Sequence, residues 1–277
     1  MPLNDDALPG RNSRRSVLRM LGAGAVACPL CLSALLKAPA ALAAETAGEA
    51  HAAPHWGYEG TVGPQNWGKL EPQFRVCELG LEQTPIDLNG GVKASVGGVT
   101  LNYQPMPLKV LNNGHTIQVN CEPGSRSRIN NNTYELLQFH FHHPSEHLLS
   151  GKAFDLECHF VHRSAAGDLA VVGVFLKPGA ENDALQPIWQ AMPTTETPER
   201  NAGTTIHLGG LLPSGREYFR YAGSLTTPPC SEGVLWTVFR NPVEASAEQI
   251  RRFAQLFPVN ARPVMPLNRR FLLESSL

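Results

Sequence analysis

Two short segments with strictly alternating side chains do most to limit how this chain can fold. Residues 138–142 read Gln-Phe-His-Phe-His, and residues 157–161 read Glu-Cys-His-Phe-Val. Successive side chains of a β-strand point to opposite faces, so each segment would present its histidines on one face and its phenylalanines on the other. We therefore predict two β-strands that pair as antiparallel neighbours across the connection 144–152.

Three histidines would meet on one face of this strand pair, namely His140, His142 and His159. A single histidine is more often a hydrogen-bonded core or surface residue than a ligand, and most other histidines of the chain are interpreted in that way. Three imidazoles buried together would leave several nitrogens without partners, at roughly 1 to 3 kcal/mol each, unless a metal engages them. Three neutral nitrogen ligands leave a tetrahedral Zn²⁺ one open position, which is typical of a catalytic site.

Two polar residues on the same face strengthen this interpretation. Gln138 and Glu157 each lie two residues from a predicted ligand. Their oxygens would accept the second ring N–H of a coordinated imidazole and fix its tautomer. Without a metal site, Glu157 would be an uncompensated buried charge, which is costly.

The remainder of the chain is typical of a protein made of many short strands. Its 25 glycines and 23 prolines are scattered throughout, and long helical periodicity is rare. Alternating or β-branched segments cover 99–103, 108–111, 116–121, 134–141, 154–162, 170–176, 218–221 and 235–239. One helix is predicted after Ser246, where Gln249 completes a capping box, and a shorter one at 184–192. We expect a mainly β fold with a large, mostly antiparallel, twisted central sheet, a few short peripheral helices, and an active site in a cleft on the sheet.

The first 43 residues have the pattern of an export signal. Residues 13–19, Ser-Arg-Arg-Ser-Val-Leu-Arg, resemble a twin-arginine signal, an apolar stretch follows at 20–36, and Ala41-Leu42-Ala43 suits a signal peptidase. A permanent membrane anchor is the weaker interpretation, because Pro29 interrupts the short apolar stretch. We predict a signal peptide at 1–43, a flexible leader at 44–54 and a catalytic domain at 55–277.

Charge and cysteine content narrow the chemistry further. The formal net charge of −1 gives no basic excess for binding nucleic acid. Four cysteines remain after residue 43, in a compartment where disulfides persist, and they allow three full pairings that spacing cannot distinguish. None of them forms a Cys-x-x-Cys pair, which argues against a cysteine-ligated zinc site.

Several separate motifs together identify a family. Residues 55–58 read His-Trp-Gly-Tyr, 83–87 Gln-Thr-Pro-Ile-Asp, and 112–115 Asn-Asn-Gly-His, and the two histidine strands follow. Residues 169–177, Leu-Ala-Val-Val-Gly-Val-Phe-Leu-Lys, and 224–230, Ser-Leu-Thr-Thr-Pro-Pro-Cys, complete the set. From residue 55 to about residue 270, the chain resembles an α-class carbonic anhydrase of the exported bacterial type.

This resemblance implies a zinc lyase that hydrates CO2 reversibly to bicarbonate and a proton through a zinc-bound hydroxide. It implies that the three histidines named above hold Zn²⁺, with Gln138 and Glu157 behind them. It further implies that Thr226 accepts a hydrogen bond from the hydroxide while donating its own proton to Glu146. His115 corresponds to the residue that relays the product proton to solvent, a task suited to an imidazole.

The resemblance also implies how the substrate is held and how the chain is braced. Val161, Val171, Leu225 and Trp236 match the apolar wall beside the hydroxide, and Thr227, Tyr58 and Gln118 match residues that line the cleft. Cys77 and Cys230 match a cysteine pair that is joined in many exported members. Cys121 and Cys158 fall on the strand faces opposite the cleft side, and we expect them to be buried free thiols.

Some alternatives remain open at this point. The spacing His140-x-His142-x3-Glu146 is also typical of cupins, in which the glutamate binds iron or manganese, although the second cupin histidine is missing after residues 177–179. A catalytically inactive relative of the carbonic anhydrases is a third interpretation, against which the intact set of histidines argues. His143 either assists proton traffic or packs at the strand end. We expect export machinery as a partner and the periplasm as the destination, with a chloroplast lumen as the alternative.

Overall fold

The computed structural model describes residues 55–276. The predicted signal peptide at 1–43 and leader at 44–54 lie outside the described residues. Within the described part of the chain, no helix is both long enough and apolar enough to cross a lipid bilayer.

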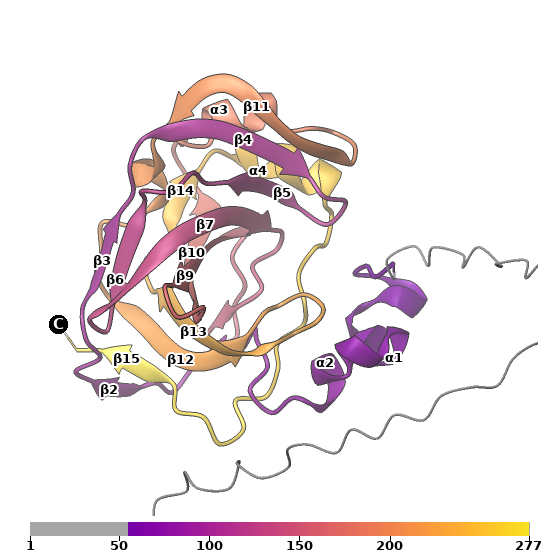
Figure 1. The fold of residues 1–277 in the computed structure, drawn as a ribbon, viewed down its shortest axis with the longest axis vertical. Coiled ribbons are helices and arrows are strands. Elements are labelled where there is room, and N and C mark those ends of the chain that lie inside the picture. Colours follow the sequence, from indigo (N-terminus) through magenta and orange to yellow (C-terminus); the bar gives the residue numbers. More distant parts are fainter. Residues whose placement is uncertain (1–54, 277) are drawn as a thin grey trace, which may run out of the picture. The chain divides into compact units, whose positions relative to one another are not determined.

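One large sheet of 13 strands dominates the fold (Figure 1). Its main path runs in the order β11 (Thr197–Ile206), β4 (Met106–Asn112), β5 (Ile117–Asn120), β7 (Asn132–His142), β9 (Leu156–Ser164), β10 (Leu169–Pro178), β13 (Glu232–Phe239), β12 (Tyr218–Ser224), β15 (Leu273–Ser275) and β2 (Val92–Ala94). Off this path, β14 (Val243–Ala245) pairs with β10, and β3 (Val99–Asn102) pairs with β6 (Arg126–Ile129), which also pairs with β7. A separate two-stranded sheet joins β1 (Asp87–Leu88) to β8 (Leu148–Leu149). The predicted fold class is confirmed, and β10 with β13 and β14, β15 with β2, and β1 with β8 are the parallel pairs among the described strands.

The histidine strands pair as the alternation predicts. β7 and β9 are antiparallel neighbours, with His140 opposite His159 and Phe139 opposite Phe160. The phenylalanines are fully buried in the larger hydrophobic core, whereas the histidines lie on the other face of the sheet. The register of this one strand pair therefore sets which residues can form a site.

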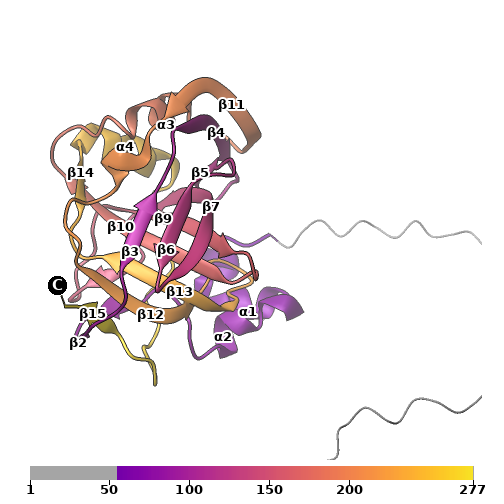
Figure 2. The ribbon, with the colours of Figure 1, turned by 60° about the vertical axis from the view of Figure 1, so that its left-hand side comes forward.

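Helices cover the core face at one end of the sheet. α3 (Gln186–Ala191) and α4 (Ala247–Leu256) lie beside β4 and β11 in Figure 2. Trp189 of α3 packs edge-on against Phe141 with ring centroids 4.8 Å apart, and stacks on Phe253 of α4 at 5.7 Å. The capping box of Ser246 and Gln249 is present at the start of α4. With α3 formed as well, both predicted helices are confirmed.

Shorter helical turns lie elsewhere in the chain. They are η1 (Gly60–Val62), η2 (Pro64–Asn66), α1 (Trp67–Leu70), η3 (Pro72–Phe74), α2 (Val76–Leu79) and η4 (Leu208–Leu211). α1 and α2 lie at the opposite end of the domain from α3 and α4 (Figure 2). Their buried residues Trp67, Phe74 and Cys77 form a small core with Cys230, which connects the start of the domain to the loop after β12.

Strand β11 was not anticipated from the sequence. It is an edge strand whose side chains are exposed at most positions, and its pairing with β4 shifts register twice. Because neither face is consistently buried, its sequence has no alternation to detect. Pro198 and Gly203 also weaken the local strand signal.

Candidate metal centre

Three imidazoles converge on one face of the sheet. His140 and His142 come from β7 and His159 from β9, and one possible ligand atom from each lies within 4.8 Å of the others. Ring centroids are 5.0 Å apart for the two β7 histidines, and His159 lies 4.5 Å from His142 and 5.4 Å from His140. His142 and His159 are buried, with 1% of their surface exposed. Such a group could hold a metal ion.

A protein oxygen faces one nitrogen of each ring. His140 Nδ1 lies 2.8 Å from Gln138 Oε1, His142 Nδ1 lies 2.7 Å from the main-chain oxygen of Asn260, and His159 Nε2 lies 2.9 Å from Glu157 Oε1. These oxygens are acceptors, so each facing nitrogen carries the proton in a neutral ring. The lone pairs are thereby left on Nε2 of both β7 histidines and on Nδ1 of His159.

Asn260 is the member of this set that the sequence did not reveal. It contributes a main-chain carbonyl, which any residue type could supply, and it is separated from His142 by 118 positions. No local pattern reports such a contact. Gln138 and Glu157 could be found from the sequence because both lie on the same strands as the histidines they face.

Glu157 is the buried hub behind His159. Its carboxylate accepts hydrogen bonds from the main-chain N–H groups of Glu146 and His147, both at 2.9 Å, and lies 2.8 Å from His147 Nδ1. Burial alone would raise the pKa of Glu157, but its contacts with His147 and His159 outweigh burial and hold the pKa well below its ordinary value. The group is therefore a charged acceptor. His147 also contacts the hydroxyl of Tyr221 at 2.6 Å.

Glu146 faces the imidazoles from the opposite direction. Its Oε1 accepts the main-chain N–H of Arg262 at 2.9 Å. Its Oε2 has no hydrogen-bond partner, although it lies 3.5 Å from His142 Nε2 and 3.8 Å from His159 Nδ1. His142 Nε2 is likewise buried without a hydrogen bond. Orphaned nitrogen and carboxylate atoms that point at one place suit a cation, so this donor set fits Zn²⁺.

One expected contact is absent. Among the hydrogen bonds of residues 55–276, none joins the Thr226 hydroxyl to Glu146, although Thr226 is buried. That bond is not formed in this structure: one oxygen of Glu146 bonds Arg262, and the other faces the imidazoles.

Comparison with known proteins places this geometry in a family. The family model of eukaryotic-type carbonic anhydrases matches residues 62–276. The chain belongs to the α-class carbonic anhydrases. A carbonic anhydrase of Nostoc sp. is 52% identical over 227 residues, which is 80% of this chain and 86% of the relative. One from Pectobacterium carotovorum is 44% identical over 220 residues, 79% of this chain and 90% of the relative.

Solved structures agree with the sequence comparison. The α-carbonic anhydrase of Thermovibrio ammonificans, in complex with the inhibitor sulfanilamide, is 44% identical. Its TM-score is 0.78, and the match covers 80% of this chain and 100% of that one. As a carbonic anhydrase, the protein catalyses the reversible hydration of CO2 to bicarbonate and a proton. The cupin alternative is therefore wrong.

In this carbonic anhydrase, His115 lies on the turn between β4 and β5 and is partly exposed. Its ring stacks on Trp56 with centroids 3.6 Å apart and an interplanar angle of 9°. Burial lowers the pKa of His115, nearby His55 lowers it further, and Glu196 opposes both. The ring is thus an uncharged base near neutral pH, able to accept a proton.

Apolar side chains border the histidines on neighbouring strands. Val161 and Trp236 are opposite Val171 in the ladders on either side of it, and all three belong to one buried cluster, against which Leu225 packs. The Trp236 ring centroid is 4.9 Å from that of His159. Thr227 is half-buried at the start of the loop after β12. The structure thus brings four predicted apolar residues together beside the imidazoles.

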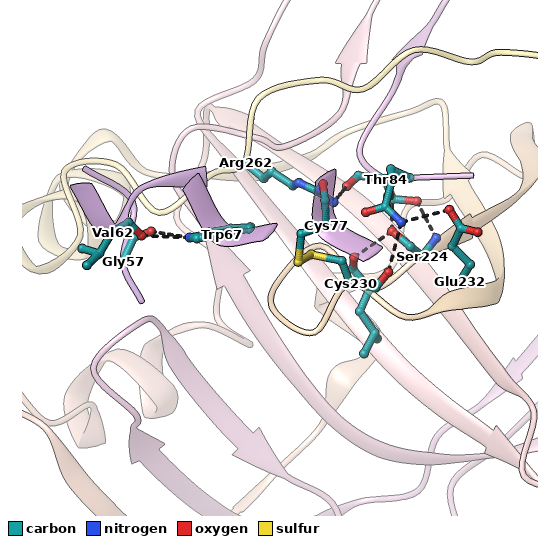
Figure 3. Close-up of a disulfide and its surroundings, with 11 residues drawn as sticks. Gly57, Val62, Trp67, Cys77, Thr84, Ser224, Cys230, Glu232 and Arg262 are labelled. Atoms are coloured by element: carbon teal, nitrogen blue, oxygen red, sulfur yellow. Dashed lines mark hydrogen bonds between the residues drawn. A yellow bond between two sulfur atoms is a disulfide. The ribbon is translucent and has the colours of Figure 1, made fainter. Parts of the chain in front are cut away.

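A disulfide braces the loop between β12 and β13, which carries Thr226 and Thr227 (Figure 3). Cys77 and Cys230 are joined across a separation of 153 residues, as the family resemblance implies. Thr84 and Ser224 exchange hydrogen bonds nearby, since each main-chain N–H donates to the other's hydroxyl at 3.0 and 2.9 Å. Cys121 and Cys158 are free thiols, of which Cys158 is buried and Cys121 half-buried.

Proposed function

We propose that His140, His142 and His159 hold Zn²⁺ and that CO2 is hydrated beside it. The observation that carries this proposal is that the two nitrogens of each imidazole have different surroundings. One nitrogen of each imidazole faces a protein oxygen, and the possible ligand atoms lie within 4.8 Å of one another. When bound to three histidines, Zn²⁺ lowers the pKa of a water molecule to about 7, a value known for carbonic anhydrases as a class.

The protein residues behind the ligands keep each ring in one tautomer. Gln138 and the carbonyl of Asn260 accept the ring N–H groups of His140 and His142, and Glu157 Oε1 lies 2.9 Å from His159 Nε2, so these oxygens orient the remaining lone pairs toward one centre. The carboxylate of Glu157 also makes His159 a more basic ligand. These contacts support zinc binding by a preformed site.

Thr226 and Glu146 orient the attacking nucleophile in this proposal. A threonine hydroxyl has one proton, so donating it to a carboxylate turns the lone pairs toward the nucleophile. The structure supports the role of Glu146 by leaving Oε2 without a partner near the imidazoles. The bond from Thr226 to Glu146 would require a turn of one of these side chains.

Substrate and proton are handled by different residues. Val161, Val171, Leu225 and Trp236 offer CO2 an apolar surface and keep water from it, and Thr227 borders that surface. His115 takes up the product proton and passes it to buffer, for which its partial exposure is suited.

We also propose that the chain is exported to the periplasm by the twin-arginine machinery that its residues 13–19 address. The disulfide supports an oxidising compartment. The route is tested by fractionating two sets of cells. The first set expresses the full chain, and the second expresses a variant with Arg14→Lys and Arg15→Lys. Periplasmic protein in the first and cytoplasmic retention in the second are expected, and equal export of both would contradict a twin-arginine signal.

A stopped-flow CO2 hydration assay, paired with metal analysis, tests the function. We expect about one zinc per chain, and activity that a chelator such as dipicolinate removes and added Zn²⁺ restores. A sulfonamide is expected to inhibit, as the complex of the Thermovibrio ammonificans enzyme suggests. Full activity in protein shown to be free of metal would refute the proposed site.

A further inference from the structure

The ladder between β5 and β7 ends before it reaches the turn that carries His115. Its last pair toward that turn is Gln118 with His140. Within the described chain, the main-chain N–H of His115 bonds locally to Asn113 Oδ1 at 3.0 Å. Its carbonyl makes one hydrogen bond to a distant part of the sequence, which is donated by Asn260 Nδ2 at 2.9 Å.

Asn260 is therefore bonded in two directions. Its Nδ2 donates to His115 and also to the carbonyl of Phe141 at 3.0 Å, while its Oδ1 accepts the main-chain N–H of His143 at 2.7 Å. Only 1% of the residue is exposed, and every polar atom of its carboxamide has a partner. Together with Thr116, whose hydroxyl donates to the carbonyl of Phe141 at 2.6 Å, this side chain joins the His115 turn to the end of the strand that carries two of the predicted ligands.

The main chain of Asn260 has a separate task. Its carbonyl accepts the Nδ1 proton of His142 at 2.7 Å, and its N–H donates to the carbonyl of His143 at 2.9 Å. These bonds do not depend on the residue type. A substitution of the side chain can therefore disturb His115 while leaving the partner of His142 in place.

We propose that the carboxamide of Asn260 is a positioning element that holds His115 at a fixed place relative to the metal ligands. The inference rests on the proposed role of His115 as proton relay. Relay through ordered water depends on distance and orientation, because a displacement of about 1 Å can slow a reaction by about a hundredfold. Asn260 therefore acts on proton export through His115 and not on the CO2 step.

Asn260→Asp is the sharpest test, because it keeps size and the acceptor for His143. It removes both N–H donors and places a carboxylate against two carbonyl oxygens. We expect kcat at low buffer concentration to fall about tenfold, with kcat/KM changed less than about twofold, and imidazole buffer to restore kcat. The zinc content should stay unchanged.

Asn182 provides a matched control. It is also buried, its Nδ2 donates to the carbonyls of Gly210 and Glu244, and its Oδ1 accepts the N–H of Ala184. Asn182→Asp thus makes the same chemical change far from His115 in the bonding network. We expect a similar loss of stability in both variants, but an unchanged ratio of kcat to kcat/KM in the control.

A nuclear magnetic resonance measurement tests the placement without zinc or turnover. The Cε1 proton of His115 should be shifted upfield by the stacked indole of Trp56 in the wild-type protein. We expect this shift to be lost in Asn260→Asp, with and without metal, and to persist in Asn182→Asp. If Asn260→Asp does not fold, Asn260→Ala serves, since it deletes the carboxamide without adding charge.

Three results would overturn the inference: an unmoved His115 resonance in a folded Asn260 variant, an equal fall of kcat and kcat/KM, or a loss of zinc. Failure of the underlying function is distinguishable from these. If His115→Ala leaves kcat unchanged in a zinc-loaded, active enzyme, the relay role fails, whereas the resonance still reports whether Asn260 holds the ring.

Discussion

Two buried histidines on strand β9 show how a proposed metal ligand differs from a core residue. His159 and His162 are three positions apart, so they lie on opposite faces, and their exposed surfaces are 1% and 0%. His162 Nε2 lies 2.8 Å from the Tyr103 hydroxyl and 2.9 Å from that of Ser127, and its Nδ1 is 3.3 Å from the carbonyl of Ala170. The protein engages both of its nitrogens. His159 makes no side-chain hydrogen bond: its Nε2 is buried without a partner although Glu157 Oε1 lies 2.9 Å away, and its Nδ1 faces Glu146 Oε2 at 3.8 Å. Unsatisfied nitrogens, and not burial, therefore distinguish the proposed ligand.

The electrostatic surroundings differ in the same sense. Burial lowers the pKa of His162 to about 4, and its neighbours are hydroxyl and carbonyl groups. Burial also acts to lower the pKa of His159, but the carboxylates of Glu157 and Glu146 outweigh it and raise the pKa. One face of the sheet thus supplies negative charge for a cation, whereas the other keeps its histidine neutral.

The largest expected difference is between the zinc content and activity of two alanine variants, His159→Ala and His162→Ala. His159→Ala removes a proposed ligand, so we expect zinc to be lost and kcat/KM to fall by at least about a thousandfold. His162→Ala should lower the melting temperature. Below that temperature, the variant should keep one zinc per chain and most of the activity. Metal analysis and CO2 hydration at low temperature measure both, and zinc lost from the His162 variant alone would reverse the comparison.

The core histidine should make stability depend on pH. The pKa of His162 is about 4 in the folded protein against the ordinary value of 6.5 for an imidazole in the unfolded chain, so the unfolded chain binds more protons between these values. Stability should therefore fall as pH drops from 6.5 toward 4, by about 3 kcal/mol in total from this group. Urea unfolding of the wild type and His162→Gln at several pH values isolates the effect, because other groups cancel in the difference. Parallel stability curves would show that His162 is not held neutral.

The sequence could predict the face of each strand but not the partners that lie beyond it. Alternation is local, so residues 138–142 and 157–161 sufficed for the pairing of β7 and β9 and for the convergence of three imidazoles. Tyr103 and Ser127, which satisfy His162, come from other parts of the chain. Alternation places His162 on the face opposite His159, but nothing local reveals which groups satisfy its two nitrogens. The carbonyl of Asn260 was hidden for the same reason, and Thr226 and Glu146 were singled out only through the family resemblance.

A smaller effect on the metal face is expected from Glu157→Gln. The amide would place its own N–H groups against the N–H groups of Glu146, His147 and His159. The His159 ring should then be held less firmly in its orientation. We expect zinc affinity to fall about 10- to 100-fold, measured by competition with a chromophoric chelator. Glu135→Gln, on β7 but bonded to Gly124, is the control and should bind zinc normally. An unchanged affinity in the first variant would mean that the carboxylate does not tune the ligand.

The smallest effect should come from Cys158, which lies between Glu157 and His159 but points to the core. Its thiol is fully buried, and burial raises its pKa well above the ordinary value, so it should not react with thiol reagents in the folded protein. Cys158→Ala deletes one sulfur from a packed core and should lower the unfolding free energy by about 1 kcal/mol. Zinc affinity and kcat/KM should be unaltered, because the sheet backbone separates the two faces. If this variant weakened zinc binding as much as Glu157→Gln, core packing and not the carboxylate would control the orientation of His159, and the contrast between the faces would fail.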